Sequence, residues 1–242
     1  GVAERLALVA VGGYGRSELS LHSDIDLLVL LDCETHAPGV ECLNHPQYQS
    51  DLTAFANFLW DIGLKPGLSV RTLDECIEQA AADQTTITNL VESRLLYGSR
   101  PLYDNLWSRI GPEHLWNSRD YFEVKLAEQR ARYAKYHDTA YNLEPNVKEG
   151  PGGLRDIQMV GWIIKRHYNS KDLHDLIVHG WLTEAEYGEL IEAQEFLWQV
   201  RFALHALTGV VVLDARLQGI VEHAAGMPGA ELRTGRRLAQ AL

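Results

Sequence analysis

The pattern of apolar and polar residues in the first third of the chain alternates between strand-like and helix-like stretches. Short apolar runs at residues 6–11 and 25–31 are typical of buried strands, and residues 68–72 form a third candidate strand. Apolar residues recur at helical spacing over 48–62, where Gly63 follows as a stop signal. The pattern therefore predicts a small sheet with helices packed against it.

Beyond about residue 84 the pattern is helical almost throughout. Two helices are expected first, one through Leu90, Arg94 and Tyr97 and the next through Leu102, Leu106 and Ile110. Three more are expected at 118–137, through 154–164 and from 183 to about 207. We therefore place the domain boundary between residues 98 and 112, and divide the chain into domains 1–105 and 106–242.

Two helix starts carry a capping box, in which a Thr side chain and a Glu three residues later cap each other's backbone. Thr72 with Glu75 predicts a helix over 73–82, and Thr183 with Glu186 begins the last predicted helix. Aromatic residues at helical spacing are expected to lie in the core or between helices; they are Phe55, Phe58, Trp60, Trp198 and Phe202, with His205 beside them.

Composition and charge exclude several classes of protein. The 242 residues are 46% hydrophobic and 23% charged, and the longest aliphatic run near a strand is residues 27–31, far too short to span a membrane. The net charge of −11 argues against DNA or RNA as a partner. Three cysteines without a CxxC pair exclude a disulfide framework and favour the cytoplasm, as does the lack of an export leader.

The charge is uneven along the chain. Residues 119–171 hold ten Lys and Arg against seven Asp and Glu, so this stretch carries +3 and the rest of the chain −14. A basic middle in an acidic protein could receive a small polyanion such as a nucleoside triphosphate, but a solvated helix face of mixed charge explains the composition equally well.

The most informative residues are a glycine turn followed by two aspartates. Gly12 and Gly13 follow the first strand, and glycines allow backbone amides to approach a phosphate closely. Asp24 and Asp26 are two apart, so on a strand both carboxylates point to one face. Such neighbours repel unless a cation lies between them, and their hard oxygens favour Mg²⁺ or Mn²⁺. Each motif alone is more often structural.

Together, the glycine pair and the D-x-D motif resemble the nucleotidyltransferase superfamily of DNA polymerase β. That resemblance implies that Gly12 and Gly13 hold a triphosphate, while Asp24 and Asp26 bind the metal ions and act in catalysis. From the residues themselves, Arg16 either contacts the phosphate, which we favour, or pairs with Glu18, and Ser17 places a hydroxyl near the phosphate. Members usually have a third carboxylate on a neighbouring strand, which residues 68–71 do not supply. Asp74, Glu75 and Glu92 are other acids within reach in the sequence, and none is assigned the role. Ser17 stands where a further glycine is usual.

Three longer stretches narrow the resemblance. They are SVRTLDEC at 69–76, YNLEPNVKEGPGGLRDIQ at 141–158 and LWQVRFALH at 197–205. With GGYGRSEL and SDIDLL they resemble the N-terminal region of the bacterial bifunctional PII uridylyltransferase/uridylyl-removing enzyme of nitrogen sensing, over most of residues 5–207. The resemblance implies an α+β fold, in which a small mixed sheet of the polymerase β-like type precedes an all-helical domain.

The same resemblance implies transfer of UMP from UTP to a tyrosine of the PII signal protein, with Mg²⁺ and release of pyrophosphate. The family's HD hydrolase domain and two ACT domains have no room in this chain, so uridylyl removal and glutamine sensing are not expected. Lys148 and Arg155 flank the glycine-rich loop. They are well placed to close over the nucleotide, although a tight turn with structural pairing of Arg155 and Asp156 is an equal alternative.

Other functions remain open from sequence alone. A related nucleotidyltransferase could use ATP, as the glutamine synthetase adenylyltransferase does, or modify a small molecule of the aminoglycoside type. The missing third acid also leaves open a non-catalytic nucleotide-binding or docking module. Nucleobase choice cannot be read from these motifs.

Overall fold

The computed structural model describes residues 5–20, 23–32, 46–136, 146–169 and 173–208. By contacts within the chain these fall into two compact units. The first holds residues 1–19 and 23–116, and the second holds residues 20–22 and 117–242. The sequence boundary at 105/106 thus lies eleven residues before this division. Each unit is described by itself.

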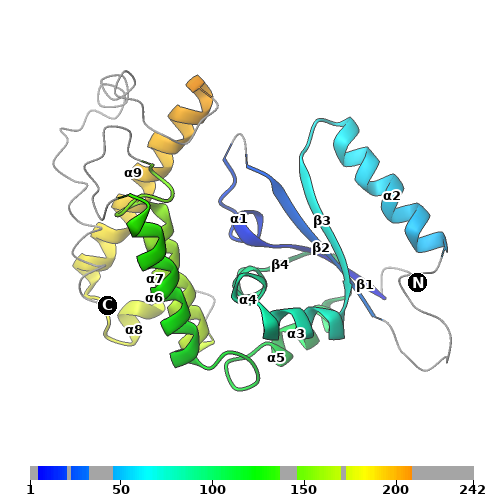
Figure 1. The fold of residues 1–242 in the computed structure, drawn as a ribbon, viewed down its shortest axis with the longest axis horizontal. Coiled ribbons are helices and arrows are strands. Elements are labelled where there is room, and N and C mark those ends of the chain that lie inside the picture. Colours follow the sequence, from blue (N-terminus) through cyan, green and yellow to red (C-terminus); the bar gives the residue numbers. More distant parts are fainter. Residues whose placement is uncertain (1–4, 21–22, 33–45, 137–145, 170–172, 209–242) are drawn as a thin grey trace. The chain divides into compact units, whose positions relative to one another are not determined.

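The first unit is built on a four-stranded mixed sheet in the order β3-β2-β1-β4 (Figure 1). β1 (Leu6–Ala10) pairs antiparallel with both β2 (Ile25–Leu31) and β4 (Arg94–Gly98), whereas β3 (Pro66–Thr72) runs parallel to β2. All five residues from Leu27 to Leu31 are buried, because β2 lies inside the sheet and both its faces are covered. The predicted α+β class and the three predicted strands are confirmed.

Short helices complete this unit. They are α1 (Gly12–Gly15), α2 (Pro46–Asp61), α3 (Leu73–Ala82), α4 (Gln84–Val91) and α5 (Arg100–Arg109). The helix predicted over 73–82 has the expected bounds, and both hydrogen bonds of the Thr72–Glu75 capping box are present. Leu102, Leu106 and Ile110 are buried as predicted along α5, whose first turn is capped by Ser99.

One predicted helix is wrong. Leu90 lies in α4, but that helix ends at Val91, and Arg94 and Tyr97 belong to the strand β4. Residues three or four positions apart share a helix face only if the backbone between them is helical. Here Gly98 ends the segment at φ +95°, and the ladder with β1 takes the backbone hydrogen bonds that a helix would use.

Two aromatic residues of α2 were also predicted wrongly, whereas Phe55 is half-buried. Phe58 and Trp60 are 56% and 57% exposed, whereas Leu59 between them is buried. In the second unit Trp198 and Phe202 are likewise exposed, although His205 is buried as expected. Helical spacing shows which side chains share a face, but it does not show what covers that face.

The second unit is helical, as predicted. It contains α6 (Ser118–Ala134), α7 (Leu154–Tyr168), α8 (Asp175–Val178) and α9 (Glu184–Thr208). Asn117 caps α6, and the Thr183–Glu186 capping box at the start of α9 is confirmed. α7 and α9 supply most of the core, which consists of Val147, Leu154, Ile157, Val160, Ile164, Leu176, Leu190, Leu197, Val200 and Leu204. None of the helices in the described segments is long and apolar enough to cross a bilayer.

Candidate active site

The glycine turn leaves the sheet at the end of β1. Gly12 has φ +57°, a left-handed conformation that suits glycine, and α1 begins there directly. The backbone N–H groups of Gly15, Arg16 and Glu18 donate to carbonyls within the turn at 2.9–3.1 Å. The first three amides of a helix have no acceptor within it, so those of Gly12 and Gly13 are available to partners outside α1.

Ser17 lies at the other end of this turn, where the backbone again takes a left-handed conformation. Its φ is +64° and its side chain is exposed. Glycine adopts this region without cost, whereas a serine is strained by about 1 kcal/mol. The conformation therefore accounts for glycine being the usual residue at this position in the family that the sequence resembles.

Asp26 lies on β2 between two glycines of the neighbouring elements. Its strand partner in the β2–β3 register is Gly67, where an added Cβ would lie 2.6 Å from Oδ1 of Asp26. On the other side, a Cβ on Gly12 would lie 3.3 Å from Oδ2. The carboxylate thus fills space left by the two missing side chains. Sequence analysis assigned Gly12 to phosphate binding and did not identify Gly67.

Asp24 precedes β2 by one residue and is exposed, whereas Asp26 is half-buried. Leu27 points into the core as predicted, with 4% of its surface exposed. The expectation that both carboxylates share one face stays a prediction. The two oxygen-donor groups suit Mg²⁺ or Mn²⁺, which bind proteins through one or two carboxylates and leave positions for phosphate oxygens and water.

The three acids considered for the role of third metal ligand have other partners. Asp74 pairs with Arg109 at 2.8 Å, Glu75 caps α3, and Glu92 pairs with Arg16. Within the described residues, no group of three or more His, Cys, Asp or Glu side chains is arranged to hold a metal ion. That Asp24 and Asp26 are the metal ligands stays a prediction.

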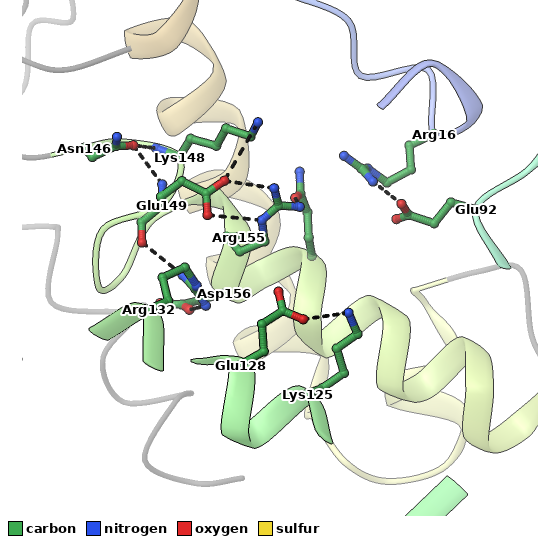
Figure 2. Close-up of polar contacts among 11 residues, drawn as sticks. Arg16, Glu92, Lys125, Glu128, Arg132, Asn146, Lys148, Glu149, Arg155 and Asp156 are labelled. Carbon is green, nitrogen blue, oxygen red and sulfur yellow. Dashed lines mark hydrogen bonds and ion pairs between the residues drawn. The ribbon is translucent and has the colours of Figure 1, made fainter. Parts of the chain in front are cut away.

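Arg16 is held between the carboxylates of Glu18 and Glu92, the second of which is drawn in Figure 2. Its Nε donates to Glu18 at 2.7 Å, and its Nη1 donates to Glu92, whose side chain is 1% exposed. Burial of the guanidinium opposes its charge, but the attraction of Glu92 and Glu18 raises the pKa of Arg16 above its ordinary value. Arg16 is therefore permanently charged, and that charge is matched within the turn and the segment after α4.

Lys148 and Arg155 belong to the second unit, Lys148 on the glycine-rich loop and Arg155 in the first turn of α7, which the loop leads into. Asn146 Oδ1 accepts from the backbone amides of Lys148 and Glu149 at 3.0 and 2.8 Å, which tightens the loop. Added Cβ atoms on Gly150 and Gly153 would lie within 3.0 Å of loop carbonyls, so the turn requires glycine at both. Residues 141–145 of the motif lie outside the described segments.

Both cations of this loop lie beside the same carboxylate (Figure 2). Arg155 Nη2 is 2.8 Å from Glu149 Oε1, and Lys148 Nζ is 3.8 Å from it. Burial would raise the pKa of Glu149, but the hydrogen bond and charge of Arg155 hold it below its ordinary value. The guanidinium also donates to Gln158 and lies over the ring of Trp162. In this arrangement the loop cations pair within the unit.

Asp156 is the buried anchor of the loop. It accepts hydrogen bonds from Arg132 Nη2, the Tyr133 hydroxyl and the Gly152 amide at 2.6–2.7 Å. Burial and the bond to Asp156 raise the pKa of Tyr133 above its ordinary value. Asp156 thus has a structural role, as one alternative predicted. Its partner is Arg132, however, and Arg155 pairs with Glu149 instead. Arg132 and Tyr133 were not predicted as partners of Asp156, because no local sequence signal indicates a contact between α6 and α7.

Comparison with known proteins shows which enzymes this chain is similar to. Residues 120–220 match the family model described as GlnD PII-uridylyltransferase. Over 207 residues, 86% of the chain, the sequence is 62% identical to the bifunctional uridylyltransferase/uridylyl-removing enzyme of Methylococcus capsulatus. Over these residues the chain is similar to the enzymes of that family. The enzymes of the same name from Nitrosococcus oceani and Pseudomonas entomophila are 53% and 52% identical over 85% and 86% of the chain.

The match covers a limited part of these relatives. The chain spans 23% of the Methylococcus capsulatus enzyme and 22% of each of the other two. The family resemblance noted from GGYGRSEL, SDIDLL and the glycine-rich loop is confirmed by these identities. The individual roles of Asp24, Asp26 and the nucleotide-binding residues remain predictions.

Proposed function

We propose that this chain carries the uridylyltransferase activity for which its relatives are named. It transfers UMP from UTP to a tyrosine of a PII signal protein in the cytoplasm and releases pyrophosphate. The observation that supports this most directly is 62% identity to an enzyme named for uridylyl transfer over 207 residues, 86% of the chain. The packing of Asp26 between Gly12 and Gly67 adds a structural reason for those residues to be kept together.

The reaction needs a nucleophile, a held triphosphate and a leaving group. The tyrosine hydroxyl oxygen forms a bond to the α-phosphorus of UTP, the bond from that phosphorus to the bridging oxygen breaks, and pyrophosphate departs. In the proposal Gly12 and Gly13 bind the triphosphate through their backbone amides, and the Ser17 hydroxyl lies at the end of the same turn. The tyrosine proton passes to a carboxylate of the Asp24–Asp26 pair or to solvent.

Asp24 and Asp26 would hold the divalent ion. When bound, Mg²⁺ or Mn²⁺ supplies polarisation of the α-phosphate and neutralises charge on the pyrophosphate. Arg16, Lys148 and Arg155 complete the predicted nucleotide-binding set, Lys148 and Arg155 by contact with the phosphates and Arg16 by holding the glycine turn. Each has carboxylate neighbours in its own unit, so binding through Lys148 or Arg155 requires the nucleotide to compete with Glu149 for their donors.

The direct test measures pyrophosphate release and the mass of PII after incubation with the chain, Mg²⁺ and either UTP or ATP. We expect a UMP adduct on PII with UTP and none with ATP. Asp24→Asn and Asp26→Asn should each lower the rate by about 100-fold or more, since several kcal/mol of transition-state stabilisation depend on the metal ligands.

Asp104→Asn is the matched control, because Asp104 is an exposed acid of the same unit that pairs with Arg100 on its own helix. It should keep the wild-type rate. An AMP adduct would replace the proposal with an adenylyltransferase. Equal pyrophosphate release by the wild type and both aspartate variants would remove the catalytic assignment. A melting temperature raised by UTP and Mg²⁺ without turnover would indicate a binding module.

A further inference from the structure

The segment that follows α4 lies against the whole length of the glycine turn. Glu92 caps the end of α4 and is buried, and Arg94 begins β4. An added Cβ on Gly15 would lie 2.2 Å from the backbone oxygen of Glu92, a distance that no side chain can occupy. The third glycine of the GGYG sequence is therefore required by this close approach.

Two side chains of the segment also hold the turn. The carboxylate of Glu92 pairs with Arg16, and Figure 2 shows the two side chains pointing toward each other. Arg94 donates from Nη2 to the carbonyl of Tyr14 at 3.1 Å and from Nε to that of Gly15 at 3.4 Å. Its guanidinium lies 5.6 Å from the centre of the Tyr14 ring. The turn is thus held through backbone and side chains alike.

These contacts have a consequence for Arg16. Glu92 is almost fully buried, so withdrawing Arg16 toward a phosphate would separate a poorly solvated carboxylate from the guanidinium that it pairs with. Glu18, which also pairs with Arg16, adds a second carboxylate to the same guanidinium. The side chain is therefore better suited to fixing the turn than to reaching a ligand.

We propose that Glu92 and Arg94 are positioning residues for nucleotide binding, acting through Arg16 and through the carbonyls of Tyr14 and Gly15. They hold the turn from Gly12 to Glu18 in the one conformation that presents its first amides. This proposal rests on the proposed function for its link to UTP, but its structural half can be measured without any nucleotide.

The first measurement is backbone hydrogen exchange of residues 12–18 in the wild type, Glu92→Gln and Arg94→Gln. The amides of Gly15 to Glu18 donate within the turn, so loosening it should speed their exchange by about tenfold or more. Glu92 is buried, so Glu92→Gln could destabilise the unit. Arg94 is exposed, so Arg94→Gln should leave the core intact and still tests the contact. Arg109→Gln, which removes the exposed pair with Asp74, is the control and should exchange like the wild type.

The second measurement is a double-mutant cycle on UTP affinity with Mg²⁺, using Arg16→Gln, Glu92→Gln and the double variant. If Arg16 acts through Glu92, each single variant weakens binding by about tenfold and the double variant is no weaker than Arg16→Gln. At saturating UTP, kcat should fall far less than KM rises, because Asp24 and Asp26 are untouched. Arg94→Lys, which keeps the charge and one donor, should recover part of the affinity lost in Arg94→Gln.

The outcomes separate the two proposals. Unchanged exchange of the turn in both Glu92→Gln and Arg94→Gln overturns the positioning role. Losses that multiply in the double variant overturn it as well, since Arg16 would then contact the nucleotide independently of Glu92. If the turn exchanges faster in the variants but the wild type binds no UTP, the structural half is supported and the proposed function is refuted.

Discussion

Arg132 and Asp156 form a buried ion pair, with Nη2 of Arg132 2.7 Å from Oδ1 of Asp156 and at most 9% of either side chain exposed. The pair joins α6 to the first turn of α7. Arg132 also donates to the carbonyl of Glu149 at 3.1 Å, so the glycine-rich loop is tied to the same guanidinium. The conformation of the loop therefore depends on a contact between two helices.

Removing Asp156 should destabilise the second unit strongly. In Asp156→Ala, Arg132 remains buried without its carboxylate, and the free energy of unfolding should fall by about 3–5 kcal/mol. Urea unfolding measures this change directly. Glu123→Ala, which removes an exposed pair with Arg119 on α6, should cost less than about 1 kcal/mol. Similar losses in both variants would contradict the importance given to the buried pair.

The stability of the second unit should depend on pH through Glu149. Its pKa is lowered in the folded protein from an ordinary value of 4.5, because Arg155 outweighs the effect of burial. A lowered folded pKa means that the stabilisation is present above about pH 4.5 and is lost as pH falls through the folded value. Unfolding free energies measured from pH 6 to pH 3 should show a decline that is reduced in Glu149→Gln.

Arg155→Gln gives the check on this assignment. It removes the partner and should flatten the same part of the curve, and the double variant should behave like either single variant. A full decline in Glu149→Gln would mean that other carboxylates carry the acid sensitivity of the unit.

Gly67→Ala should impair the active site while leaving the sheet folded. The new Cβ would lie 2.6 Å from Oδ1 of Asp26, so the carboxylate must move away from β3. We expect uridylyl transfer to fall by about tenfold or more, as small displacements of a reacting group are costly. Gly188→Ala on α9 meets no atom within 4 Å and should keep full activity. Full activity of Gly67→Ala would show that Asp26 needs no fixed position.

Cys76 should be unreactive in the folded protein. The side chain is completely buried, and burial raises the pKa of its thiol to about 11, so little thiolate exists near pH 8. Iodoacetamide should leave the Cys76 peptide unmodified in buffer and modify it in urea, as read by mass spectrometry. Equal labelling in both conditions would indicate that α3 opens readily.

Local sequence signals predicted those elements whose determinants are local. The buried run at 25–31 and the Thr72–Glu75 capping box gave the correct bounds for β2 and α3. β4 was missed because its strand character comes from pairing with β1, some 85 residues earlier in the chain. The exposed Phe58 and Trp60 were misjudged for a related reason, since burial is decided by distant neighbours.

The candidate site divides in the same way. The glycine turn and the D-x-D motif can be read from the sequence, because each is contiguous. Gly67 becomes part of the site only through the parallel register of β2 and β3, and Glu92 only through the pairing of β4 with β1. Strand register cannot be read from local signals in a single sequence, so these contacts are seen only in the structure.

The opposition of Gly67 and Asp26 also bears on how the sheet assembles. If β3 paired one residue out of step, Asp26 would face Leu68 or Pro66, and the strand would turn its other side to the core. A charged group would then lie beside a bulky apolar side chain instead of a glycine. Misaligned pairing is thereby penalised during folding, so the residue proposed for catalysis helps to select the correct alignment of its own strand.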